Sequence, residues 1–76
     1  MSKSACVQEA EDYLERIQDK LEQVPERAYD KAGDFFDSVE ERSKAIYETV
    51  LRTNVMTPKQ QEALSNMLDA VDKWIH

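Results

Sequence analysis

The chain has 76 residues, with 16 acidic and 10 basic side chains and a net charge of −6. A chain of this length forms a single domain, residues 1–76, with a small core. Its one cysteine excludes an internally disulfide-bonded scaffold, and a hydrophobic fraction of 41% is too high for a disordered acidic tail. No apolar run reaches the roughly 18 residues of a membrane span, and residues 1–14 lack the apolar core of a signal peptide. We therefore expect a cytoplasmic protein.

The first segment predicts a helix over about 5–23. Its apolar residues alternate at spacings of three and four, which is typical of a narrow coiled-coil-like stripe. The stripe consists of Val7, Ala10, Leu14, Ile17, Leu21 and Val24. Ser4 is a suitable N-cap. Because the stripe should be buried, we expect Leu14→Ala to cost ~2–5 kcal/mol.

Pro25 interrupts this pattern, and the apolar stripe does not continue in phase beyond it. A phase break at a proline favours a chain reversal over a kink in one long helix, which is the alternative. In the reversal, Val24 is extended and Pro25 takes the first position of the next helix. The pattern thus predicts an antiparallel helical hairpin around Pro25.

The second predicted helix covers about 26–53. Its stripe has the same spacing and consists of Tyr29, Ala32, Phe36, Val39, Ser43, Ile46, Val50 and Thr53. Further apolar side chains widen this face, as suits a central helix with two neighbours: Ala28, Phe35, Tyr47 and Leu51. We interpret Gly33 as the site of a close helix crossing rather than a hinge, and expect Ile46→Ala to cost ~2–5 kcal/mol.

The third predicted helix covers about 58–75. Asn54 is a suitable end for the preceding helix, and Thr57-Pro58-Lys59-Gln60 combines an N-cap threonine, a proline at the first helical position and a glutamine at the third. Together the three segments predict an all-α fold, a small three-helix bundle.

The sequence offers little for catalysis. The only histidine is the terminal His76, and Cys6 has no histidine near it in sequence to act as a base. We interpret Cys6 as a passive thiol, with an intermolecular disulfide or redox contact as the alternative. The acidic stretch from Asp30 to Asp34 lacks the alternating ligands of a calcium loop. We therefore predict no enzyme activity, no catalytic or metal-binding residue and no cofactor.

The charge distribution argues against nucleic-acid and membrane surfaces. The ten basic residues are scattered along the chain and form no patch for phosphates. Interfacial helices carry a basic polar face, whereas the first two helices carry acidic rows. The row on the first helix is Glu11, Glu15, Asp19 and Glu22, and the row on the second is Asp30, Asp34, Asp37, Glu41 and Glu48. Four helical ion pairs are expected: Asp12–Arg16, Glu40–Lys44, Glu48–Arg52 and Asp69–Lys73.

The most informative surface residues are acidic and aromatic. One row follows the second helix, and three aromatic residues exceed what so small a core can cover. The predicted partner-binding residues are Asp30, Asp34, Asp37, Glu41, Glu48, Phe35, Tyr47 and Trp74. The alternative for the acidic rows is a solvated face that keeps the protein soluble.

These features predict a non-catalytic protein–protein interaction module, a small acidic helical adaptor or inhibitor that self-associates. Its partner would be a protein with a basic or apolar surface, approached with the help of the acidic rows. The alternative is an acidic nucleic-acid mimic that inhibits a DNA- or RNA-binding enzyme. A third hypothesis is a structural subunit of a larger assembly.

Overall fold

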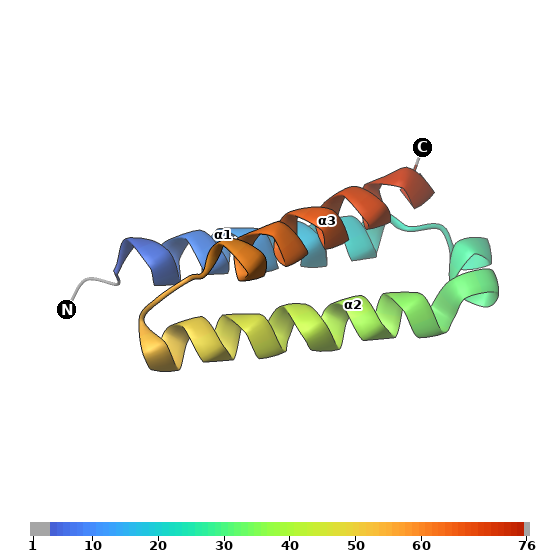
Figure 1. The fold of residues 1–76 in the computed structure, drawn as a ribbon. Helices are drawn as coiled ribbons and strands as arrows, with labels where there is room; N and C mark the ends of the chain where they lie inside the picture. The colour runs from blue at the N-terminus through green and yellow to red at the C-terminus, as the bar shows by residue number, and fades with distance from the viewer. Residues whose placement is uncertain (1–3, 76) are drawn as a thin grey trace.

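A computed structural model describes residues 4–75 of the chain. It contains three helices, α1 (Ala5–Gln23), α2 (Glu26–Thr53) and α3 (Pro58–Ile75). They lie side by side in an elongated bundle with principal extents of 42 × 18 × 16 Å (Figure 1). The chain runs along α1, returns along α2 and then follows the direction of α1 again in α3. The predicted all-α three-helix bundle and its helix boundaries are confirmed.

Local side-chain hydrogen bonds define two of the helix starts. The Ser4 hydroxyl accepts a hydrogen bond from the Val7 amide at 3.2 Å and caps α1. At the start of α3 the Gln60 amide donates to the Thr57 hydroxyl at 3.1 Å, and the Thr57 amide donates to Gln60 Oε1 at 2.9 Å. This reciprocal pair is the predicted capping box.

The residues between the helices end one element and begin the next. Asn54 ends α2 in the left-handed conformation, with φ 62° and ψ 25°. At the other connection the predicted reversal is confirmed, and Val24 is extended as expected. The expected place of Pro25 is wrong by one position. Pro25 is itself extended, with ψ 148°, and α2 begins at Glu26, so the proline serves as the N-cap.

The second helix is kinked near its start, at Ala32, whose φ of −139° and ψ of 35° are not helical. The predicted close crossing at Gly33 is wrong, because a Cβ atom at this glycine would meet nothing within 4 Å. The glycine thus lies beside a bend in open space. The bend sets the first turns of α2 at an angle to the rest of the helix (Figure 1).

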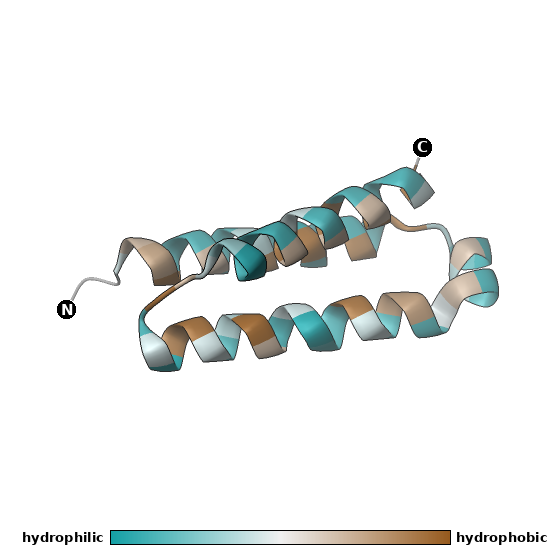
Figure 2. Cartoon of the chain, viewed as in Figure 1, coloured by the Kyte–Doolittle hydropathy of each residue, from teal (hydrophilic) through white to brown (hydrophobic). Residues whose placement is uncertain are grey.

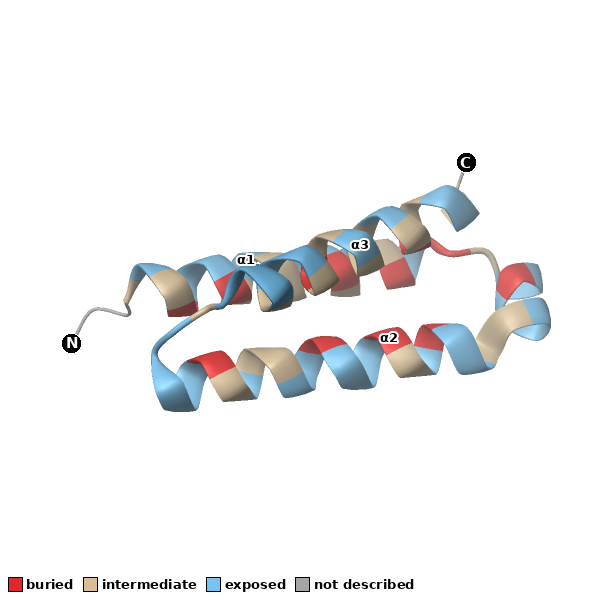
Figure 3. Cartoon of the chain, in the orientation of Figure 1, coloured by how far each residue is buried: buried red, intermediate tan, exposed pale blue. Residues whose placement is uncertain are grey.

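Most of the core lies between the three helices. Hydrophobic residues line the inner sides of the ribbons (Figure 2), and buried residues follow the same sides (Figure 3). The larger cluster consists of Ile17, Leu21, Val24, Ala28, Phe36, Val39, Leu64 and Val71. A second cluster near the start of α1 joins Val7, Ala10 and Val50.

The predicted stripes are only partly correct in what they bury. Ser43 is fully buried, and its hydroxyl donates to the Glu40 carbonyl oxygen at 2.9 Å. Leu14, in contrast, is only partly buried, while Tyr29 and Thr53 are exposed. In both helices the apolar stripe is wider than the area that the neighbouring helices cover, so residues at the edges of each stripe remain in contact with solvent. Among residues 4–75, no helix is long and apolar enough to cross a membrane.

Candidate interaction surface

The five predicted acidic residues all lie on the exposed surface of α2. They are Asp30, Asp34, Asp37, Glu41 and Glu48. From Asp34 to Glu48 the spacings are three, four and seven residues, so these four keep to the side of α2 that faces away from the core, whereas Asp30 precedes the bend at Ala32. The structure therefore brings them together as one acidic row, without placing a basic side chain of the bundle in ion-pair contact with any of them among residues 4–75.

An aromatic cluster gathers where α2 and α3 meet, near the Pro25 turn. Phe36 is the buried centre, with only 1% of its surface exposed. The rings of Phe35 and Trp74 pack edge-on against it, with centroid distances of 5.4 and 5.7 Å. Both nevertheless remain 38–39% exposed. Two of the predicted aromatic residues thus share one surface, and a third ring, that of Tyr29, reaches Phe36 at 4.7 Å.

Tyr47 does not belong to this surface. It is partly buried and packs against the second core cluster with Val7, Ala10 and Val50. That cluster lies at the opposite end of α2 from the aromatic cluster. The sequence groups Tyr47 with Phe35 only because both lie beside the apolar stripe of one helix.

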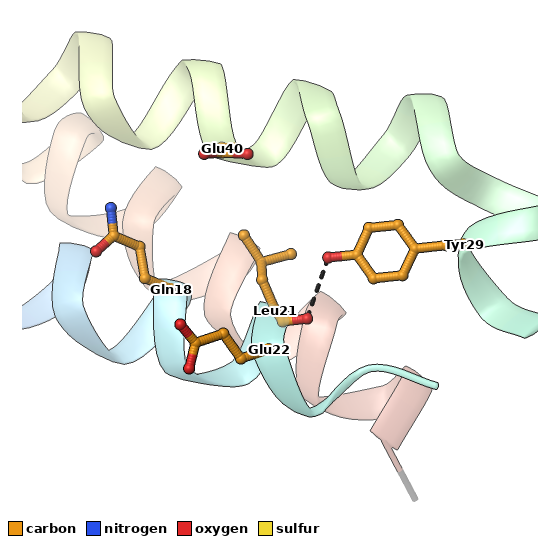
Figure 4. Close-up of a pocket in the computed structure, with 5 residues that line it drawn as sticks. All are labelled: Gln18, Leu21, Glu22, Tyr29 and Glu40. Carbon is orange, nitrogen blue, oxygen red and sulfur yellow. Dashed lines mark hydrogen bonds between the residues drawn. The ribbon is translucent and has the colours of Figure 1, made fainter. Parts of the chain in front are cut away.

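Tyr29, which the sequence placed only in the apolar stripe of the second helix, lines a hollow of about 290 Å³ between α1 and α2 (Figure 4). Its hydroxyl donates a hydrogen bond to the Leu21 carbonyl oxygen at 3.1 Å. The carboxylates of Glu22 and Glu40 border the same hollow, together with Gln18. The pairing of Leu21 with Tyr29 follows from the Pro25 turn, which is the only signal in the sequence that could have indicated it.

The environment of Tyr29 favours its neutral phenol. Burial of the hydroxyl raises the pKa of Tyr29 above its ordinary value, and the carboxylates of Glu40 and Asp37 raise it further. Any tyrosine is protonated at neutral pH, and the raised pKa keeps this hydroxyl a hydrogen-bond donor to Leu21 further into the alkaline range. This polar contact fixes the ring against both arms of the hairpin.

A second hollow, of about 380 Å³, lies between α2 and α3. It is lined by Arg42, Ala45, Ile46, Ala63, Asn66 and Met67. Most of these side chains are apolar or small, and no carboxylate is among them. The hollow can accommodate an apolar side chain from outside the bundle, but it has no convergent pair of acid and base.

The remaining candidates for chemistry are isolated. Cys6 is a free thiol, partly buried against the second core cluster, and His76 lies outside the described residues. Between Ser4 and Ile75, no group of three or more histidine, cysteine, aspartate or glutamate side chains is placed to hold a metal ion. Within these residues, therefore, the surface features that stand out are the acidic row and the exposed aromatic rings.

Ion pairs contribute little to the arrangement of this surface. Of the four expected helical pairs, Glu40–Lys44 forms, with a distance of 3.1 Å between Nζ and Oε1. A pair that the sequence did not indicate, Lys20–Asp72, joins α1 to α3 at 2.8 Å. Both pairs are partly exposed, so each contributes at most about 1 kcal/mol to stability.

Comparisons with protein-family models, with curated proteins and with solved structures find no match to this chain.

Proposed function

We propose that the protein is a non-catalytic protein–protein interaction module, a small acidic helical adaptor or inhibitor. The observation that supports this proposal most directly is the exposure of Phe35 and Trp74. Both rings rest on the buried Phe36 and yet keep more than a third of their surface in solvent. Rings held in this way are rigid, so a partner can bury them with a small loss of conformational entropy.

The acidic row of α2 supports a partner with a basic surface. Asp30, Asp34 and Asp37 lie in the same part of α2 as Phe35, so an apolar contact and a charged contact are close together. Exposed carboxylates increase the rate of association with a basic protein more than they strengthen the final complex. The aromatic rings would therefore supply affinity, and the acidic row would guide the approach.

A pull-down from cell extract with quantitative mass spectrometry tests this proposal. The protein is compared with a variant in which Asp30, Asp34, Asp37 and Glu41 are changed to serine. A matched control changes four other exposed carboxylates to serine: Asp12, Glu15, Glu62 and Asp69. Both variants raise the net charge from −6 to −2, since each removes four negative charges.

We expect the acidic-row variant to recover less of the partner than the control variant does, because it associates with a basic surface more slowly. Unchanged recovery by the acidic-row variant would reject the electrostatic part of the proposal. A competition experiment distinguishes a nucleic-acid mimic from an adaptor. Displacement of the protein from its partner by duplex DNA, together with binding that weakens steeply as salt is added, indicates a mimic. Binding that resists salt indicates an apolar contact through the aromatic rings.

A further inference from the structure

The contact between α2 and α3 is the least extensive of the three helix contacts in the bundle. Helix α1 packs against both of the other helices. The hollow of about 380 Å³ lies on the face formed by α2 and α3, and Ala45 and Ala63 line it. Such small residues let another helix approach closely. Phe35 and Trp74 extend the apolar surface toward the Pro25 turn, since both rings rest on Phe36.

Two rows of unlike charge border this face. Both rows repeat every seven residues, which is close to two helical turns, so each row stays on one edge of its helix. The edge of α2 carries Asp34, Glu41 and Glu48, and the edge of α3 carries Lys59, Asn66 and Lys73. All are exposed, and none of the charged ones forms an ion pair with another residue between Ser4 and Ile75.

We infer that the α2–α3 face binds a second copy of this chain, about a two-fold axis parallel to the helices. In this dimer α2 of one copy lies over α3 of the other, so that the acidic edge meets the basic edge on both sides of the axis. The two apolar hollows face each other in the middle. The contact is the same for both copies, as a two-fold interface requires.

The register of the bundle agrees with this pairing. The ring contact between Phe36 and Trp74 sets the height of α2 against α3, which run in opposite directions. A rotation about an axis along the bundle leaves every height unchanged. Asp34 then comes within about three residues of the level of Lys73, an offset of ~4.5 Å that a lysine side chain spans.

The same offset applies at the other end of the face, where Glu48 meets Lys59, and in the middle, where Glu41 meets Asn66. Phe35 comes to the level of Trp74 of the second copy. A two-fold axis perpendicular to the helices would instead place α2 over α2 and oppose two acidic edges. Charge complementarity therefore favours the axis along the bundle.

One residue on this face opposes association. Arg42 lines the hollow, and the proposed axis brings the Arg42 side chains of the two copies near each other. Their like charges weaken the contact. Removal of this charge by Arg42→Leu should therefore strengthen the dimer.

This inference deepens the proposed function and rests on it, because it takes Phe35 and Trp74 as part of a protein contact. A second copy and a different partner would therefore compete for these two rings, whereas Asp30, Asp37 and the hollow at Tyr29 lie outside the dimer contact. Self-association is measured on the purified protein alone. Sedimentation can therefore show no dimer while the pull-down still recovers a partner, and the pull-down can recover no partner while sedimentation shows a dimer.

Sedimentation equilibrium over a concentration series up to about 1 mM tests the dimer. We expect the wild type to show a monomer–dimer equilibrium. The double change of Lys59→Glu and Lys73→Glu should raise the dissociation constant at least about tenfold, since both basic edges then repel the acidic ones. Adding Asp34→Lys and Glu48→Lys to the same chain should restore the dimer, because the two edges have exchanged their charges.

A matched control changes Arg16 and Lys44, which lie off the face, to glutamate and alters the net charge by the same amount. We expect it to weaken the dimer less than the change at the basic edge. Circular dichroism checks that each variant is folded. Should a charge-reversal variant unfold, the wild-type series and Arg42→Leu still decide the matter.

Several results would overturn the inference. The first is a wild type that stays monomeric throughout the concentration series. The others are a charge exchange that does not restore association and a control variant whose dimer is as weak as that of the basic-edge variant. Weaker association of Arg42→Leu would contradict the placement of the axis.

Discussion

Phe36 is the residue on which the aromatic surface depends, and Phe36→Leu tests that role. The substitution keeps an apolar side chain in the core but removes the ring that Tyr29, Phe35 and Trp74 contact. Phe35→Leu is the matched control. It makes the same change at the next position of the chain, where the ring is 38% exposed and touches one other ring.

The expected loss follows from these contacts. Aromatic pairs contribute ~0.5–1.5 kcal/mol each beyond the burial of their area, and partly exposed pairs lie at the lower end of that range. Three such contacts around Phe36 amount to ~2 kcal/mol, and the smaller leucine leaves a cavity that adds roughly 1 kcal/mol. The control loses a single ring contact, which lowers the free energy of unfolding by less than about 1 kcal/mol. The free energy of unfolding of a domain of this size is ~4–11 kcal/mol, so both variants should remain folded.

Urea unfolding measures the difference. Circular dichroism follows the helices, and the fluorescence of Trp74, the only tryptophan, follows the aromatic cluster itself. We expect the free energy of unfolding of Phe36→Leu to fall by ~2–3 kcal/mol and its native fluorescence to shift to the red. If Phe36→Leu costs no more than Phe35→Leu, then Phe36 does not support the surface and the argument for rigid, exposed rings is wrong.

Three further predictions concern single positions. Ile17→Ala should lower the free energy of unfolding by ~2–5 kcal/mol and Leu14→Ala by less than about 2, because Ile17 is fully buried and Leu14 is not. Equal losses of stability in urea unfolding would contradict this difference. Gly33→Ala should raise the melting temperature and increase the free energy of unfolding by ~0.4–1 kcal/mol, since the added methyl group meets open space and the glycine has no positive φ. A lower melting temperature would show strain at the kink. The raised pKa of Tyr29 stabilises the fold while the phenol is protonated. This contribution to the free energy of unfolding is complete below pH ~10, which is the pKa of tyrosine in the unfolded chain. It is lost as the pH rises through the higher pKa of the folded state. Tyr29→Phe should remove this part of the alkaline dependence of urea stability, and an identical pH profile in the variant would refute it.

The candidate surface was only partly predictable from the sequence. The exposure of the four carboxylates from Asp34 to Glu48 follows from helical periodicity alone. Phe35 and Trp74, however, lie far apart in the chain and meet only because both contact Phe36. Tyr47 has the same place beside the apolar stripe as Phe35, yet it packs at the other end of the bundle. A periodic pattern gives the side of a helix on which a residue lies, but not the neighbour that covers it.

By itself, the sequence determined where the helices begin and end. The capping box at Thr57 and Gln60, the left-handed Asn54 and the turn at Pro25 are local, because each depends on residues within a few positions along the chain. Only the tertiary structure decided the rotation of each helix, the bend at Ala32 and which side chains are covered. Those properties depend on contacts between helices, where a stripe of apolar residues is wider than the area that its neighbours can bury.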